Sequence, residues 1–227
     1  AEATAITKKL LSFFQGAKKD WEEKDQTPLR TMIPEDRRKG FPVRDILNTI
    51  ADENSFLEMK KIFGRSVITG FMRIEGRPFA VLANDCQQLG GAIDSSAADK
   101  AANFIEICSA HGLPILSFVD TPGFMVGPDS EKEGAFRRMG ELFKHGARIK
   151  TPLVGIILRR GYGLGAMAMM GGSFVDPIYS ASWPNGEFGG MGLEGYVKLG
   201  FKKELEAEET EEKKKALFDK LVARMYE

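Results

Sequence analysis

The stretch LPILSFVDTPG, residues 113–123, decides the fold class, together with LVGIIL at residues 153–158. Each is a short apolar run with branched residues, which is typical of a strand buried on both faces. Each also follows a segment with helical spacing of its apolar residues, at 94–111 and at 133–150. Strand following helix twice over predicts a parallel α/β core with right-handed crossovers. Ligands are then expected at the carboxyl ends of these strands, at Asp120–Gly123 and Arg159–Gly163.

Working outward, the sequence predicts a hairpin before the first of these helices. Residues 66–74 and 79–83 are strand-like, and the turn between them reads EGRP. A short helix is predicted from Pro42 to Ile50. A second, small-residue helix is predicted from Gly165 to Met170, directly after the Gly-rich turn.

The two ends of the chain differ from this core. Residues 4–24 place apolar side chains at helical spacing among lysines, which predicts an amphipathic helix, and 27–41 reads as a linker. Residues 202–226 predict an exposed charged helix. We therefore divide the chain into a helix and linker at 1–30, an α/β domain at 31–200 and a helical tail at 201–227. Because it opens at Ala1, a longer parent polypeptide is expected.

Composition narrows the class of protein. The chain has 227 residues, 43% of them apolar, which supports one sizeable core. Lys+Arg and Asp+Glu are equal at 32 each, so no global basic field favours nucleic acid or a membrane surface. No apolar run is long enough to span a bilayer. Cys86 and Cys108 carry no metal-ligand pattern and are expected to be reduced thiols. The expected location is the cytoplasm, with the mitochondrial matrix as the alternative.

Two Gly-rich loops precede helix starts. One is RRGYGLGAMAMMGGS at Arg159–Ser173, and the other is LGGAID at Leu89–Asp94. Glycine lets backbone approach a ligand closely, and the first amides of a helix have no helical acceptor. Two such loops suggest the two halves of an oxyanion hole for an enolate. Tight turns in which glycine serves only packing remain the alternative at each loop.

Several segments together resemble a known family. Gly90–Asp94 and Gly161–Ala166 look like the two oxyanion loops of the crotonase superfamily. Residues from about Met32 to Tyr226 resemble the C-terminal domain of the carboxyltransferase subunit of biotin-dependent acyl-CoA carboxylases of the acetyl- and propionyl-CoA type. The segments that carry this resemblance are Pro34–Arg38, Leu89–Asp94, Ala101–Phe104, Val119–Phe124, Arg159–Ala166 and Trp183–Gly192.

The resemblance implies a fold and an activity. The implied fold is an α/β crotonase-like (ClpP/crotonase) spiral of ββα units. The implied reaction moves CO2 from carboxybiotin, delivered on a carrier domain, to the α-carbon of an acyl-CoA through enolates held by backbone amides. Biotin is the implied cofactor and acyl-CoA the co-substrate. The implied partners are a preceding N-terminal carboxyltransferase half, a biotin carboxylase and a biotin carboxyl carrier protein, within a homo- or hetero-oligomer, without nucleic acid or membrane.

The resemblance also assigns roles to residues. The oxyanion donors would be Gly165 and Ala166 for the biotin carbonyl, with Gly90, Gly91 and Ala92 lining the same pocket. The residues expected to contact biotin are Tyr162, Gly163, Trp183, Gly189, Gly190 and Met191. A core role for Trp183 is the alternative. Ala168 stands where propionyl-type relatives carry an Asp implicated in acyl-chain choice, so the preferred acyl chain stays open.

Two alternative functions stay open, and other classes of site are disfavoured. An acyl-CoA decarboxylase subunit would use the same chemistry in reverse, and a biotin-docking or assembly module would use none of it. A hydratase or isomerase of the crotonase type is disfavoured, because Met167–Met169 hold no carboxylate. Asp120 is expected to cap the turn that follows it, with a chemical role as the alternative. His111 and His145 lie outside the Gly-rich loops, so the sequence indicates neither a nucleophile with a His base nor a metal site, and it holds no P-loop.

Overall fold

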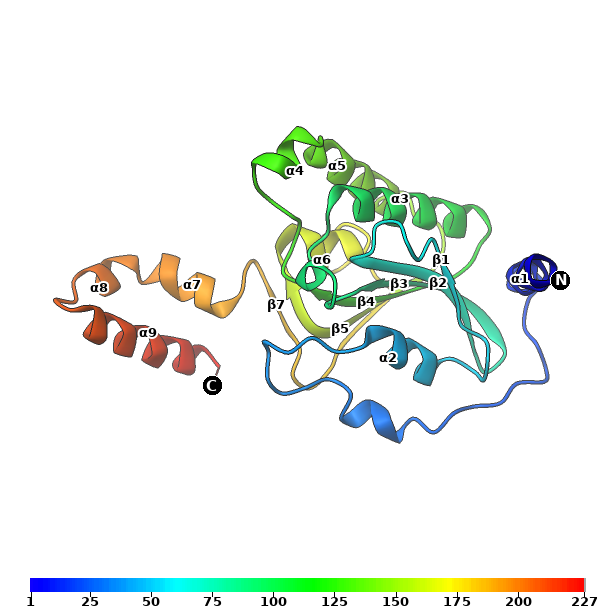
Figure 1. Cartoon of the computed structure of the whole chain (residues 1–227), viewed down its shortest axis with the longest axis horizontal. Coiled ribbons are helices and arrows are strands. Elements are labelled where there is room, and N and C mark those ends of the chain that lie inside the picture. The colour runs from blue at the N-terminus through cyan, green and yellow to red at the C-terminus, as the bar shows by residue number, and fades with distance from the viewer. Residues whose placement is uncertain (227) are drawn as a thin grey trace.

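The strands predicted around 113–119 and 153–158 lie side by side in the middle of a seven-stranded sheet (Figure 1). This computed structural model describes residues 1–226, so the last residue of the predicted tail, 227, lies outside it. The strands are β1 (Leu57–Met59), β2 (Val67–Ile74), β3 (Arg77–Asn84), β4 (Ile115–Thr121), β5 (Leu153–Tyr162), β6 (Tyr179–Ser182) and β7 (Glu187–Gly189). The helices are α1 (Glu2–Ser12), α2 (Val43–Ile50), α3 (Ser95–Ala110), α4 (Pro128–Lys132), α5 (Ala135–Gly146), α6 (Gly163–Met169), α7 (Leu193–Gly200), α8 (Lys202–Glu206) and α9 (Glu211–Met225), with short 3-10 turns η1 (Thr27–Arg30) and η2 (Leu89–Gly91).

The sheet order is β1-β2-β3-β4-β5-β6, with β7 also pairing with β5. β1, β2 and β3 are antiparallel, whereas β3, β4, β5 and β6 run parallel. The predicted hairpin is β2–β3, and β4 and β5 are parallel neighbours, as the sequence predicted. The α/β class is thereby confirmed.

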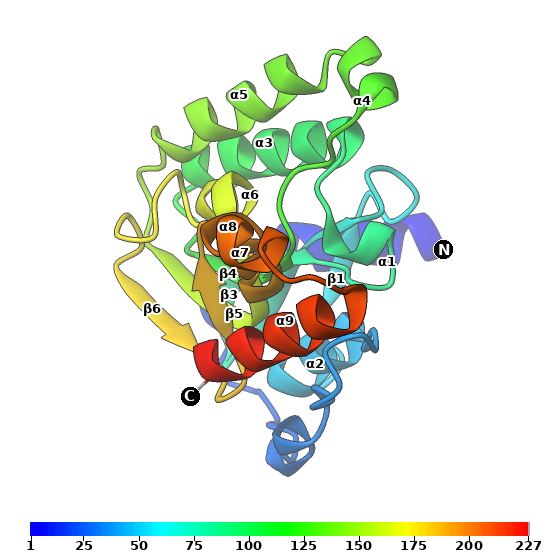
Figure 2. The same ribbon diagram turned by 90° about the vertical axis from the view of Figure 1, so that its left-hand side faces the viewer.

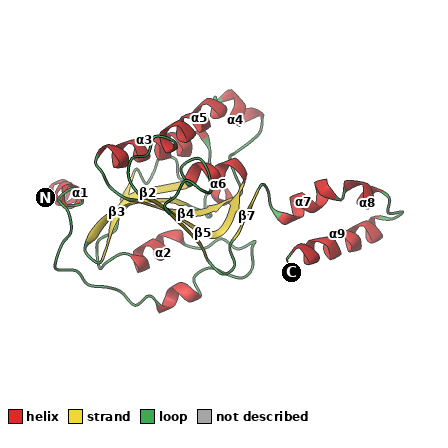
Figure 3. Cartoon of the chain, turned by 180° about the vertical axis from the view of Figure 1, so that it is seen from behind, coloured by secondary structure: helices red, strands yellow, loops and turns green. Residues whose placement is uncertain are grey.

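Both faces of the sheet are buried, which explains the continuous apolar strands. Along β2, Val67 and Phe71 face a core under α3, α5 and α6, while Ile68 and Met72 face a second core under α2. This alternation is the period of two that a strand imposes on its side chains. Figures 1 and 3 show α3 and α5 on one face and α2 on the other.

The helix predicted over 4–24 is wrong in its second half, because α1 ends at Ser12. Arg73, which is buried, donates to the carbonyl oxygens of Ser12 and Gly16 at 2.6 and 2.9 Å. Gly16 adopts φ +85°, and Phe13 turns into the core, where its ring stacks on Phe71 at 5.5 Å between centroids. The chain then leaves the helix and continues without regular structure to η1.

The C-terminal tail is two helices rather than one. α8 and α9 are separated at residues 207–210, and Thr210 caps α9 by accepting from the amide of Lys213. Together with α7 they project from the sheet at the end opposite α1 (Figures 1 and 3). The division of the chain at residues 30 and 200 stays a prediction.

Candidate functional site

The site begins where β4 and β5 end. Thr121 and Gly161 are register partners at the carboxyl ends of these parallel strands. β5 passes directly into α6 through Gly163, which adopts φ +59°. A Cβ at Gly163 would lie 3.2 Å from the carbonyl oxygen of Gly190, so glycine is needed both for the turn and for the close approach of the β7 loop.

The first turn of α6 presents backbone amides. The first four N–H groups of a helix have no intrahelical acceptor and carry partial positive charge. Within residues 1–226, no side chain caps this helix. Gly165 and Ala166 are buried, and a Cβ at Gly165 would lie 2.7 Å from the Cα of Gly123. The first turn of α6 is therefore held directly against the segment that follows β4.

The second predicted loop lies on the other side of that segment. Gly90 and Gly91 both have positive φ, and a Cβ at Gly91 would collide with the carbonyl oxygen of Asp120. In this conformation the amides of Gly91 and Ala92 donate to the carbonyls of Gln88 and Leu89, at 2.9 and 3.1 Å. The amide of Gly90 has no protein acceptor in the described part of the chain. Of the three predicted residues, Gly90 alone thus offers an unengaged amide.

A buried ion cluster, missed in the sequence, joins the two loops. Asp120 is fully buried and accepts from Arg159 Nη2 at 2.9 Å and from Arg160 Nε at 2.9 Å. Arg160 also donates to the carbonyl oxygen of Gly90 at 2.7 Å. Burial is the largest single effect on Arg160 and opposes its charge, but the hydrogen bond to Asp120 and the negative charge of Asp120, with smaller contributions from Cys86 and Tyr162, together raise the pKa of the guanidinium. Asp120 and Arg160 thereby tie the Gly90 loop to the end of β5.

The prediction that Asp120 caps the following turn is wrong. The hydroxyl of Thr121 has that role, since it accepts from the amide of Gly123 at 3.1 Å. The carboxylate of Asp120 points to the arginines instead. The sequence did contain a signal for this cluster. Two adjacent arginines end one predicted strand, and an Asp ends the neighbouring strand.

A second polar network surrounds Tyr162. Its hydroxyl donates to Glu187 at 2.7 Å, and Glu187 also pairs with Arg37 at 2.7 Å. The guanidinium of Arg37 lies over the ring of Tyr226, 3.5 Å from its centroid. Burial and the neighbouring Glu187 raise the pKa of Tyr162, so its hydroxyl remains a neutral donor. This network links the N-terminal arm, β7 and α9.

The predicted biotin-contact residues divide into two groups. Tyr162 pairs with Gly189 in the β5–β7 ladder, and Gly190 and Met191 follow at the mouth of α6. Cβ atoms at Gly189 and Gly190 would meet open space. Trp183 instead packs against the core under α2. Ala168, predicted to influence acyl-chain choice, is fully buried in the core under α3.

Of the two thiols, Cys86 lies near Asp120 and Arg159, whereas Cys108 lies in the core under α3. Cys86 and Cys108 are free and buried, and burial raises the pKa of Cys108 to about 12. Residues 1–226 contain no cluster of His, Cys, Asp and Glu suited to a metal ion. None of their helices is long and apolar enough to cross a membrane.

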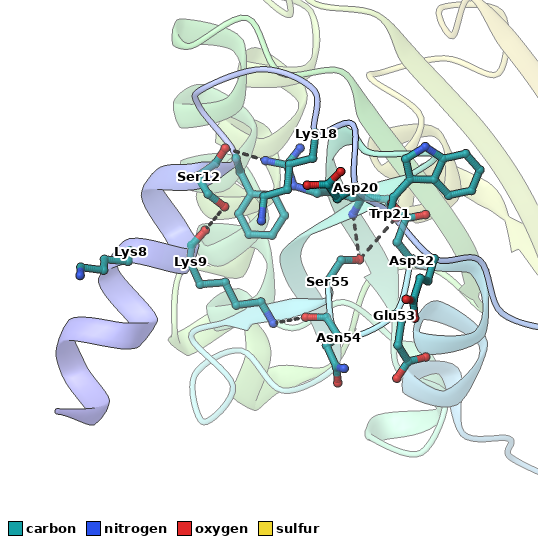
Figure 4. Close-up of a pocket in the computed structure, with 13 residues that line it drawn as sticks. Lys8, Lys9, Ser12, Lys18, Asp20, Trp21, Asp52, Glu53, Asn54 and Ser55 are labelled. Carbon is teal, nitrogen blue, oxygen red and sulfur yellow. Dashed lines mark hydrogen bonds between the residues drawn. The ribbon is translucent and has the colours of Figure 1, made fainter.

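A cavity that the sequence did not signal lies at the other end of the molecule. It has a volume of about 640 Å³ and lies between α1 and the segments at 18–22 and 52–55 (Figure 4). Lys9 spans its edge and donates to the carbonyl oxygen of Asn54 at 2.7 Å. Both cations and carboxylates line it, so its wall has no single sign of charge that would select a charged ligand.

Comparison with known proteins decides the family. The protein family described as "Carboxyl transferase domain" matches this chain over residues 2–227. The chain belongs to this family. It is 33% identical over 189 residues to the "Propionyl-CoA carboxylase, carboxyltransferase subunit" of Haloferax mediterranei, covering 82% of this chain and 36% of that protein. It is 33% identical over 216 residues to the methylmalonyl-CoA carboxyltransferase 12S subunit of Propionibacterium freudenreichii, covering 90% of this chain and 40% of that protein.

Solved structures agree with this assignment and confirm the predicted crotonase-like fold. A single-chain, multi-domain long-chain acyl-CoA carboxylase superposes with a TM-score of 0.89 at 46% identity, over 99% of this chain and 22% of that one. The transcarboxylase 12S hexamer, with methylmalonyl-CoA bound, superposes with a TM-score of 0.84 at 29% identity, over 97% of this chain and 43% of that one. The chain thus spans less than half the length of these relatives.

Proposed function

We propose that this chain forms the carrier-side half of a biotin-dependent carboxyltransferase that acts on an acyl-CoA. The observation that carries the proposal is the first turn of α6, which no side chain within residues 1–226 caps and where the backbone of Gly163 approaches the carbonyl oxygen of Gly190 in the open loop of Gly189 and Gly190. The family and the relatives named for acyl-CoA carboxyl transfer support the same activity.

The residues at α6 fit biotin. Its head is a flat, uncharged urea, so it requires amide donors at its carbonyl oxygen and close walls on its faces. The helix start supplies the donors. Glycines at 163, 189 and 190 carry no side chain, so the backbone can approach the faces of the ring closely. No charged side chain is required at the carbonyl. When bound, biotin would supply a nitrogen that carries the carboxyl group between substrates.

The residues of the chain would then act by orientation and electrostatic stabilisation. Amides at a helix start stabilise negative charge that develops on a carbonyl oxygen, and each such donor contributes about 2.7–4 kcal/mol in a transition state. Tyr162 and Glu187 would hold the β7 loop against α6, and Arg160 would hold the Gly90 loop. A preceding N-terminal half would supply the acyl-CoA side of the site, with a biotin carboxylase and a carrier protein as further partners. Ala168 would influence acyl-chain choice only indirectly, through packing beneath α6.

A glycine-to-alanine pair tests the proposal in the enzyme that contains this chain and its N-terminal half. Gly165→Ala forces α6 away from Gly123, which displaces the amides. We expect carboxyl transfer to free biotin to fall by about 100-fold or more, the usual effect of losing an oxyanion donor. Gly140→Ala is the matched control, because a Cβ there meets nothing within 4 Å. Equal activity of the two variants would refute the assignment.

A further inference from the structure

The segment Pro34–Arg38 is one of those that carry the family resemblance, yet it belongs to neither Gly-rich loop. Residues 31–42 form an arm that is neither helix nor strand. Figure 1 shows this arm reaching toward β7 before it turns back into α2. A segment without backbone ladders takes its position from other contacts, and this arm is held at two points.

The first point is the buried ion cluster at the ends of β4 and β5. Arg159 donates from Nη1 to the carbonyl oxygen of Lys39 at 2.6 Å, and its guanidinium lies 4.8 Å from the centroid of the Phe41 ring. Phe41 is buried, and both its amide and its carbonyl contact the sulfur of Cys86 at 3.3 Å. The last residues of the arm are therefore fixed relative to the carboxyl end of β5.

The second point is Glu187, the first residue of β7. One of its carboxylate oxygens pairs with Arg37 at 2.7 Å, and the other accepts from the hydroxyl of Tyr162 at 2.7 Å. Within residues 1–226, Arg37 is the one cation that forms an ion pair with Glu187. The side chain of Glu187 is 17% exposed and that of Arg37 is 44% exposed, so solvent screens the pair in part. The ring of Tyr226, 3.5 Å from the guanidinium, also holds Arg37 in place.

β7 depends on such contacts because it is short. It consists of three residues and, in the described part of the chain, pairs only with β5. Directly after it, the carbonyl oxygen of Gly190 approaches the backbone of Gly163 at the start of α6. A displacement of Glu187 is therefore passed along β7 to the loop that borders the first turn of α6.

We propose that Arg37 is a positioning residue for carboxyl transfer: by holding Glu187, it fixes the loop after β7 against the first turn of α6. This inference rests on the proposed function, in which biotin binds at that loop. In this role Arg37 touches neither biotin nor the transferred carboxyl group, so it affects how firmly biotin is bound and not the chemical step. The same role explains why an arm without regular structure is fixed to both β5 and β7.

The test is steady-state carboxyl transfer from malonyl-CoA or methylmalonyl-CoA to free biotin, in the enzyme that contains this chain and its N-terminal half. In Arg37→Ala we expect the KM for biotin to rise about three- to fivefold, the size expected of one half-exposed ion pair with a cation–π contact. The KM for the acyl-CoA and the kcat at saturating biotin should each stay within about twofold, because only biotin binding is altered. A purely structural role would instead lower kcat through loss of folded enzyme and leave both KM values unchanged.

Two further variants separate Arg37 from its surroundings. Arg38→Ala is the matched control, because it removes a neighbouring exposed arginine that forms no ion pair within residues 1–226, and it should leave both KM values unchanged. Glu187→Gln should raise the KM for biotin as Arg37→Ala does. Adding Arg37→Ala to Glu187→Gln should then have no further effect, since residues that act through one another are not additive.

Three results would refute the role of Arg37: an unchanged KM for biotin in Arg37→Ala, an equal rise in Arg38→Ala, or a full further rise in the double variant. Transfer to biotin by the unaltered enzyme tests the proposed function separately. Each of the three results would therefore count against Arg37 alone and leave the proposed function in place.

Discussion

At the scale of single residues, Asp120 contributes most to the architecture of the site. Its carboxylate is fully buried between two arginines, so Asp120→Asn would leave Arg159 without its buried counter-charge. We expect a loss of about 3–5 kcal/mol in the free energy of unfolding, the usual cost of removing one partner from a buried pair. Urea denaturation measures it.

The control for Asp120 is a surface ion pair of the same residue types. Asp99 pairs with Arg138 on the exposed side of α3, and Asp99→Asn should change stability by less than about 1 kcal/mol. If Asp120→Asn and Asp99→Asn lowered the free energy of unfolding by the same small amount, the buried cluster would not stabilise the contact between the loops.

Lys100 predicts a pH dependence of stability. Its folded pKa is about 8 and its unfolded value about 10.4, so between these values the unfolded chain binds more protons. The free-energy cost of burying the charged ammonium is fully present below this window and is relieved as pH rises through it. Stability should therefore rise relative to Lys100→Met, by up to roughly 3 kcal/mol at about 1.4 kcal/mol per pKa unit. Parallel denaturation curves at every pH would contradict this.

At the scale of elements, the sequence predicted those with strong local patterns. The hairpin β2–β3, the buried strands β4 and β5, and α3 with its Asp94 cap all follow from apolar pattern and turn residues. β6 and β7 were missed, because each is short and pairs only with β5, across a loop. The long helix expected at the N-terminus was wrong because Arg73, far away in sequence, accounts for its end.

The predictions for the site depended on the same difference between local sequence pattern and contacts made by residues far apart in sequence. Backbone roles at Gly163, Gly165 and Gly190 depend on chain conformation, which glycine spacing indicates. Side-chain roles at Trp183 and Ala168 depend on direction, and both side chains face the core. The tie made by Arg160 required the three-dimensional meeting of two loops, so spacing alone did not indicate it.

The unit formed by α7, α8 and α9 should be the least firmly held part. Arg37 joins it to the body by lying over Tyr226 while pairing with Glu187. Arg37→Ala should speed cleavage by a Glu-specific protease at Glu208 and Glu209 roughly two- to fivefold, since such a contact contributes about 0.5–1 kcal/mol. Arg38→Ala, which removes a neighbouring exposed arginine, should not change the rate. Equal acceleration by both variants would show that charge alone matters.

At the scale of the whole molecule, the mouth of α6 is left open and apolar. Leu164, Phe188 and Met191 are 63%, 65% and 44% exposed around it. Figure 2 views the molecule from this end, with α7, α8 and α9 in front of the sheet. Exposed apolar side chains next to uncapped amides are expected of a surface that another part of the enzyme completes. The chain by itself is therefore expected to be inactive.

Reconstitution tests this half-site most directly. Carboxylation of free biotin from malonyl-CoA or methylmalonyl-CoA would be measured with this chain alone, with the N-terminal carboxyltransferase half alone, and with the two mixed. The half-site account predicts transfer only in the mixture, with the better acyl donor identifying the substrate. No transfer in a mixture whose complex is confirmed by sedimentation, or full transfer by this chain alone, would contradict it.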